Sequence, residues 1–180
     1  MQFETFDIEG PVLITPRVFS DSRGHFFESY SKQKFAEAGI PEEFVQDNQS
    51  LSCAGTVRGL HFQAPPFAQG KLVRVTQGAV LDVIVDIRKA SKTFGKSLKI
   101  ELSADNFRIF WVPPGFAHGF SVLKDQTIFT YKCTNYYNQP SEGGILFNDP
   151  DLGIDWEVAQ PIVSDKDLIL PRLKDLKSPF

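Results

Sequence analysis

Histidine, lysine and tyrosine side chains are the residues of this 180-residue chain that best suit proton-transfer chemistry. His61 lies in residues 56–63, and His118 follows a Pro-Pro-Gly turn. A histidine near neutral pH is a general base that can remove a proton from a carbon next to a carbonyl. The enolate oxygen that forms needs a cation or donor, for which Lys71 is the nearest candidate in sequence. Tyr131 is a candidate acid that returns a proton from the opposite face.

Other interpretations of the histidines stay open on sequence alone. His61 can equally be a core histidine whose ring is only hydrogen-bonded, and His25 fits an exposed loop. Arg58 and His61 are three residues apart, which on a regular strand places them on opposite faces. Gly59 between them therefore indicates a bulge or a close backbone approach if both serve one site.

A metal centre is not favoured by this sequence. It has no His-x-His pair, and His61 is followed by Phe62, Gln63 and Ala64, none of which is a strong ligand. A zinc or iron site needs about three protein ligands in an open geometry. We therefore expect neither a metal nor a cofactor.

Anion-binding side chains are spread through the region of expected strands. The arginines there are Arg17, Arg23, Arg58, Arg74 and Arg88. An arginine can clamp phosphate through two donors, although each of these taken singly also fits a solvated surface. The polar triplet Gln46-Asp47-Asn48 can hydrogen-bond hydroxyls or phosphate. The chain has no Walker A or GxGxxG loop, so a P-loop NTPase or a classical dinucleotide fold is not supported.

Short strands must position these groups. Residues 97–103 alternate apolar and polar side chains, which predicts a strand with one wet face. Residues 80–87 are apolar apart from Asp82 and Asp86, which predicts a central strand covered on both faces. Further strands are expected over residues 72–76, 109–112, 118–123 and 128–134.

Helical periodicity is scarce. One helix is predicted over residues 32–38, with Ser31 as N-cap and Gly39 at its end. A further turn is expected from Pro41 to Phe44, and a short helix around residues 172–176. Because no helices alternate with the strands, we expect an all-β protein, a double-sheet jelly roll with a few short helices. The length fits a single domain over 1–180 with its C-terminal tail docked on the barrel.

Composition excludes several classes of protein. The net charge of −3 gives no basic field for nucleic acid, and every apolar stretch is interrupted well before the ~18 residues of a membrane helix. The first residues carry no basic region followed by an apolar run, so we expect no signal peptide. Cys53 and Cys133 form no CxxC pair, and we expect two buried thiols in a cytoplasmic protein.

Several short motifs, each weak alone, occur in order along nearly the whole chain. They are PRVF at 16–19, DxRG at 21–24, FFES at 26–29, QDN at 46–48, VRGLHFQ at 57–63, KLVRV at 71–75, VPPGFAHGF at 112–120, YKCT at 131–134, YY at 136–137, EGG at 142–144, NDP at 148–150, IDW at 154–156 and SxKD at 164–167. In this combination the chain closely resembles the dTDP-4-dehydrorhamnose 3,5-epimerases, small metal-free cupins of the dTDP-L-rhamnose pathway.

The resemblance implies a role for each matching residue. His61 would be the proton acceptor, oriented by Asp167, with Lys71 holding the C4 enolate and Tyr131 donating the proton. The nucleotide sugar would be bound by Arg23, Glu28, Gln46, Asp47, Asn48, Arg58, His118, Tyr137, Glu142 and Lys166, with Tyr137 stacked on thymine. The resemblance also implies a dTDP-sugar substrate and a homodimer that exchanges N-terminal strands.

Three rival functions remain on sequence grounds. A relative that epimerises only C5 or only C3 would use the same histidine, lysine and tyrosine. A catalytically silent nucleotide-sugar-binding cupin is disfavoured because those three residues are retained. A metal-dependent cupin oxygenase is disfavoured by the missing His-x-His pair.

Overall fold

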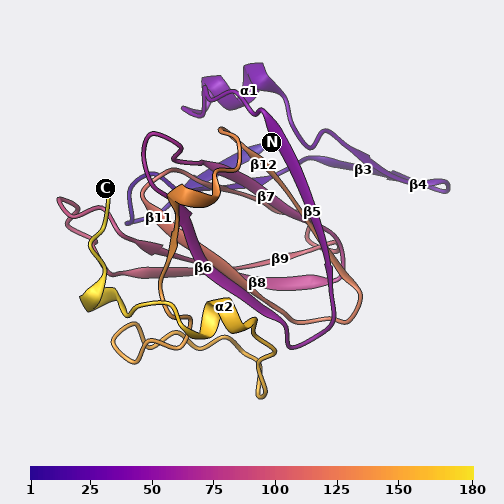
Figure 1. Ribbon diagram of the computed structural model, residues 1–180. Coiled ribbons are helices and arrows are strands. Elements are labelled where there is room, and N and C mark those ends of the chain that lie inside the picture. Colours follow the sequence, from indigo (N-terminus) through magenta and orange to yellow (C-terminus); the bar gives the residue numbers. More distant parts are fainter.

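Two antiparallel sheets face each other in the computed structural model, which describes residues 1–180 (Figure 1). The six-stranded sheet has the order β1 (Gln2–Thr5), β2 (Val12–Thr15), β10 (Ile109–Val112), β7 (Lys71–Gln77), β12 (Thr127–Cys133) and β5 (Gln46–Ser52). The five-stranded sheet has the order β13 (Glu142–Gly144), β6 (Val57–Gln63), β11 (Phe116–Val122), β8 (Ala79–Asp86) and β9 (Ser97–Ser103). The predicted all-β jelly roll is confirmed.

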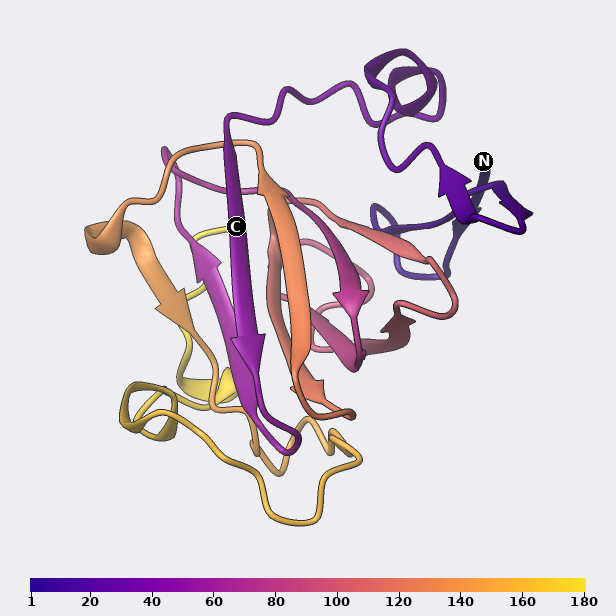
Figure 2. The ribbon, with the colours of Figure 1, turned by 90° about the vertical axis from the view of Figure 1, so that its right-hand side faces the viewer.

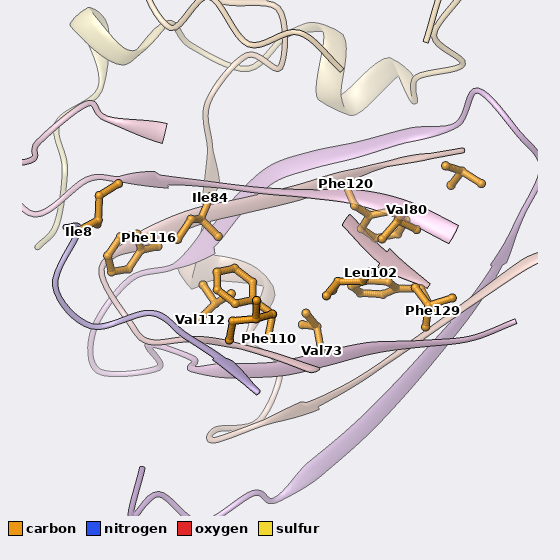
Figure 3. Packing of buried hydrophobic residues seen from close by; sticks show 13 residues of the cluster. Ile8, Val73, Val80, Ile84, Leu102, Phe110, Val112, Phe116, Phe120 and Phe129 are labelled. Carbon is orange, nitrogen blue, oxygen red and sulfur yellow. The ribbon is translucent and has the colours of Figure 1, made fainter. Parts of the chain in front are cut away.

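Alternating side chains explain why the sheets stack. Val73 and Val75 of β7 meet Val80 and Ile84 of β8 in one cluster between the sheets, which the aromatic rings of β10, β11 and β12 fill (Figure 3). In β9 the predicted alternation is confirmed, since Lys99 is exposed while Leu98 packs against this cluster. Removing this apolar surface from water is the main force that holds the two layers together.

The outer faces of both sheets are also covered, which explains why every residue of β8 is buried. On the five-stranded sheet, Leu81, Val83 and Val85 pack with residues of the C-terminal segment, including Trp156 and Phe180. On the six-stranded sheet, the cover comes from helix α1 (Lys32–Glu37) and the loop after it. Figure 2 shows these N-terminal elements gathered on one side of the barrel.

A two-stranded hairpin, β3 (Val18–Asp21) with β4 (Gly24–Phe27), projects from the body of the molecule (Figure 1). Its side chains Phe19 and Phe26 are 52% and 71% exposed. Near its base, the rings of His25 and Phe27 lie against Phe107. Two large apolar side chains held in water on a projecting hairpin are typical of a surface that contacts another protein.

The helices differ in part from the sequence predictions. Helix α1 is confirmed, with the Ser31 side chain accepting from the Lys34 N–H, but no helical turn follows Pro41. The C-terminal segment contains α2 (Asp165–Leu168), which was not predicted, and a 3₁₀ turn, η2 (Leu173–Asp175), where a short helix was expected. Another 3₁₀ turn, η1 (Gln139–Ser141), precedes β13.

The two cysteines differ in their surroundings. Cys133 is buried as predicted, whereas the prediction for Cys53 is wrong because this residue is exposed, in the loop after β5. Both thiols are free. Separately, no helix of the structure is long and apolar enough to cross a membrane.

Candidate active site

A cavity of about 540 Å³ opens between the sheets at the end of the apolar cluster. His61 of β6, Lys71 of β7, His118 of β11 and Tyr131 of β12 all line it. A smaller hollow of about 100 Å³ shares His61, Lys71 and Tyr131 with it. Cavities of this size hold small organic ligands in other proteins. Three of the residue types singled out in the sequence therefore meet at one place.

The strand β6 carries the irregularity expected at Gly59. The four residues 58–61 of β6 span the same length of sheet as the three residues 118–120 of β11, so β6 has one residue more. Gly59 has φ +121°, and a Cβ there would lie 2.5 Å from the Gly119 Cα. Only glycine fits such an approach. The extra residue brings Arg58 and His61 to the same cavity, and the predicted bulge with close backbone approach is confirmed.

His61 is paired with a buried carboxylate. Its Nε2 donates to Asp167 Oδ1 at 2.6 Å, and the Gly59 N–H donates to the other oxygen at 3.2 Å. Burial would raise the pKa of Asp167, but the hydrogen bonds and charge of His61 and the bond from Gly59 outweigh it and lower that pKa. An ionised carboxylate fixed on one imidazole nitrogen leaves the other, Nδ1, free to accept a proton.

Asp167 reaches this position through helix α2, which the sequence did not predict. Ser164 caps the helix by accepting from the Asp167 N–H. The single turn is too short for a periodic apolar pattern, but the S-x-x-D spacing is an N-cap signal that was present in the sequence. The cap turns the Asp167 side chain toward β6.

Lys71 and Tyr131 lie side by side on the neighbouring strands β7 and β12, in the same wall of the cavity. The Lys71 Nζ lies 5.9 Å from the centre of the Tyr131 ring. Burial lowers the pKa of Lys71, while the negative groups Asp82 and Glu142 and the Cys133 thiol act in the opposite direction. Burial also raises the pKa of Tyr131, so its phenol keeps its proton near neutral pH. An amine and a phenol therefore lie beside the His61 ring in one cavity.

The mouth of the cavity is held by a polar cluster. Lys166 Nζ lies 2.6 Å from Glu142 Oε2, and the Tyr137 hydroxyl donates to the same carboxylate at 3.2 Å. Burial would raise the pKa of Glu142, but the bond and charge of Lys166, the bond from Tyr137 and the charge of His61 together outweigh it and lower that pKa. At the opposite side, Arg58 donates to the Ser52 Oγ. Charged and aromatic groups therefore ring the opening.

The three residues of the predicted Gln46-Asp47-Asn48 triplet, all on β5, do not point to the same face of the sheet. Gln46 and Asn48 point inward and line the smaller hollow. Asp47 points to the other face of the sheet, where it pairs with Lys132 at 2.9 Å. Its side chain lines neither hollow of the site. Because successive side chains of a strand point to opposite faces of the sheet, this difference between Asp47 and its two neighbours was predictable from the sequence.

Two further predicted residues lie outside the site within one chain. Arg23 sits at the tip of the β3–β4 hairpin, where it pairs with Asp21 at 2.7 Å. Glu28 follows the hairpin and pairs with Lys34 of α1. Neither lines the cavity. Arg23 thus lies on the arm that projects from the body (Figure 1), whereas Glu28 lies between that arm and α1.

His118, opposite His61 in the β6–β11 register, has its own buried partner. Its Nε2 donates to the Asp82 oxygens at 3.0 Å and 2.9 Å, and Asp82 is fully buried. Sequence reasoning did not assign Asp82 to the site. The signal was available, because a carboxylate interrupts the otherwise apolar residues 80–87.

The site offers no set of donors for a metal. No group of three or more His, Cys, Asp or Glu side chains is arranged to hold an ion. The two imidazoles each direct Nε2 to a carboxylate instead. What the arrangement can do is move protons: a base, a cation and a phenol acid share one cavity.

Comparisons with known proteins agree with this chemistry. The family model for dTDP-4-dehydrorhamnose 3,5-epimerase matches residues 5–175. A curated dTDP-4-dehydrorhamnose 3,5-epimerase from Shigella flexneri is 52% identical over 163 residues, 90% of each chain.

Solved structures give the same relationship. A 3,5-epimerase from Legionella pneumophila in complex with dTDP-4-keto-L-rhamnose has a TM-score of 0.94 and 44% identity, covering 98% of this chain and 94% of that one. A 3'-monoepimerase from Streptomyces bikiniensis, in complex with dTDP-quinovose, has a TM-score of 0.89 and 32% identity, covering 94% and 86%. The family match over nearly the whole chain shows that this protein belongs to the dTDP-4-dehydrorhamnose 3,5-epimerase family.

Proposed function

We propose that this protein epimerises dTDP-4-dehydro-6-deoxy-D-glucose at both C3 and C5 to give dTDP-4-dehydro-L-rhamnose. The observation that carries the proposal is the His61–Asp167 pair, which shares one cavity with Lys71 and Tyr131. Both carbons are α to the C4 ketone, so one base, one cation and one acid serve both inversions. No redox step is involved, and the reaction therefore requires no cofactor.

The proposed chemistry follows from the positions of these groups. Nδ1 of His61 takes the proton from C3 or C5, and the C–H electrons move into an enolate whose oxygen carries the negative charge. The Lys71 ammonium neutralises that oxygen, which is worth most inside a site with little water. Tyr131 then gives its proton to the other face of the carbon; His61 releases the proton it took to solvent, and the phenol is reprotonated from solvent. General acid–base catalysis of this kind contributes about 10²–10⁴-fold to a rate.

The nucleotide end of the substrate suits the polar mouth of the cavity. Arg58 lines the cavity and offers a planar fork of donors to a diphosphate. Tyr137, 56% exposed beside the Glu142–Lys166 pair, presents a ring for stacking on the base. Binding energy from these remote contacts aligns the sugar ring for reaction at its far end.

A homodimer is the second part of the proposal. Arg23 and Glu28 match the family's substrate-binding positions, but Arg23 lies at the tip of the projecting arm and Glu28 directly after it, both away from the cavity of their own chain. The arm also carries the exposed rings of Phe19 and Phe26. Exchange of N-terminal segments between two chains would bury these rings and bring Arg23 and Glu28 to the partner's cavity. Equilibrium sedimentation of wild type and of Phe26→Ser tests this, and a monomeric wild type would contradict it.

Epimerisation at a single carbon is the alternative. The identity of 52% to a 3,5-epimerase, against 32% to a 3'-monoepimerase, favours the double reaction. Incubation with the substrate and a reductase that accepts only the L-rhamno product tests it directly. Reductase-dependent oxidation of the nicotinamide cofactor is expected. A mono-epimerised product, seen by NMR in the same mixture, would replace the proposal by the alternative.

A further inference from the structure

The buried carboxylate of Asp82 stands out because it lies in the apolar interior of the barrel. On β8 it lies between Val80 and Ile84, which point into the apolar cluster between the sheets, and residues two apart share a face. Its fractional exposure is zero. Burying a carboxylate costs several kcal/mol unless partners offset it.

The hydrogen bonds of this carboxylate all lead to the active site. Both oxygens accept from Nε2 of His118, and the side chain makes no other hydrogen bond. His118 lines the cavity that also holds Lys71, and Asp82 is one of the negative groups that favour the charged form of Lys71. The barrel thus contains two imidazole–carboxylate pairs side by side, His61–Asp167 and His118–Asp82, on paired strands.

A purely structural role fits these contacts poorly. A buried ion pair is weak evidence for stability, because apolar residues of similar volume are often as good or better in the same place. Asp86, on the same strand and equally buried, shows what a structural carboxylate looks like: it accepts from Arg88, Ser91 and Thr93, none of which lines the cavity. Asp82 has no such network.

We propose that Asp82 is a positioning residue of this site, which holds the His118 ring in the cavity wall and supplies a counter-charge for the Lys71 ammonium. The proposal rests on the proposed function of the cavity. By accepting at Nε2, Asp82 directs His118 Nδ1 to the substrate and fixes which nitrogen carries the proton. By adding a negative charge inside the barrel, it keeps Lys71 a cation ready for the enolate oxygen.

The titratable groups around Lys71 influence the pKa that an NMR titration of this lysine would measure. Asp82 on β8, Cys133 and Tyr131 on β12, and Glu142 on β13 surround it, and the two histidines share its cavity. Burial lowers the pKa of Lys71, and the Asp82 charge opposes that shift. Removal of this charge should therefore lower the pKa of Lys71 further.

The test compares Asp82→Asn with the matched variant Asp86→Asn. For Asp82→Asn we expect kcat to fall about 10–100-fold, the usual cost of removing the carboxylate that orients a functional histidine, with a thermal midpoint close to wild type. The Lys71 titration, followed by NMR of ¹³C-labelled lysine and assigned with Lys71→Arg, should move to lower pH. Asp86→Asn should lose stability and leave the Lys71 titration unchanged.

Three outcomes would overturn the proposal: wild-type kcat in Asp82→Asn, an unmoved Lys71 titration, or a loss of kcat no larger than its loss of folded protein. Asp82→Ser, also uncharged, must reproduce the titration shift, and serves if the asparagine variant does not fold. The NMR titration needs no turnover. If wild type fails to epimerise the substrate, the proposed function fails while the role of Asp82 toward Lys71 is still decided.

Discussion

Replacement of Asp167 by asparagine is a sharp perturbation because this carboxylate accepts from two donors at once. Nε2 of His61 lies 2.6 Å from one oxygen and the Gly59 N–H 3.2 Å from the other. An amide has one acceptor oxygen and one NH₂ group. If its oxygen faces Gly59, the NH₂ faces Nε2, and the His61 proton must move to Nδ1, where the base is needed. If its oxygen faces His61, the buried Gly59 N–H loses its partner.

The size of the effect follows from these two contacts. A hydrogen bond to a charged group contributes about 1.5–3 kcal/mol, and a buried donor without a partner costs about 1–3 kcal/mol. If the transition state loses about 3–5 kcal/mol of stabilisation relative to the bound substrate, kcat drops by roughly 10²–10⁴-fold, at about 1.4 kcal/mol per factor of ten. The substrate still has the polar mouth of the cavity, so KM should change far less than kcat.

The assay is steady-state turnover of Asp167→Asn, coupled to the reductase, with Asp149→Asn as its control. Asp149 is equally buried and also accepts from two backbone N–H groups, of Leu173 and Asp151, but lies outside the cavity. The control should lose stability and keep its kcat. A kcat of Asp167→Asn within about threefold of wild type would refute the role given to this carboxylate.

Three further predictions follow from the same contacts. Tyr131→Phe should still exchange substrate hydrogens in D₂O through His61 but return the proton on the same face, so NMR should show deuterated substrate of unchanged configuration; normal product would remove the phenol from the mechanism. Treatment with EDTA should leave kcat unchanged, since no metal-binding group of side chains is present, and loss restored by added metal would contradict this. The pKa of Asp86, which burial would raise, is lowered from its usual 3.8 to about 2 by hydrogen bonds from Arg88, Ser91 and Thr93. Because the pKa of Asp86 is lower in the folded than in the unfolded chain, its ionised carboxylate stabilises the folded protein above about pH 4. This stabilisation is lost as the pH falls toward 2. Asp86 should therefore contribute about 2 kcal/mol in urea unfolding at pH 6, and a stability of Asp86→Asn with the same pH dependence as wild type would be inconsistent with this.

Strands were predictable from the sequence where apolar and polar residues alternate or where nearly all residues of a segment are apolar. Residues 97–103 and 80–87 became β9 and β8 because period two and complete burial leave clear marks on a sequence. The β3–β4 hairpin was missed because its turn, Ser22-Arg23, lacks the Asn-Gly or Asp-Gly pair that marks a tight turn. The turn expected from Pro41 failed because proline only permits a helix start, and no periodic apolar residues follow it there.

The site was predictable in its residue types and not in its geometry. His61, Lys71 and Tyr131 come together because β6, β7 and β12 belong to facing sheets, a long-range fact that no local pattern contains. Asp167 lies 106 residues from His61 and arrives through one helical turn. Asp47 was grouped with its neighbours although the pleat turns it to the other face, where Lys132 pairs with it. Asp82 was visible as a break in an apolar run, but its partner became known only with the sheet register.

The role of His61 as the base is tested most directly by NMR in D₂O with wild type and His61→Asn side by side. Wild type should place deuterium at both C3 and C5 of the product. The variant should incorporate none at either carbon while binding dTDP with an affinity close to wild type. Deuterium at C3 or C5 in His61→Asn at a rate near wild type would contradict the account.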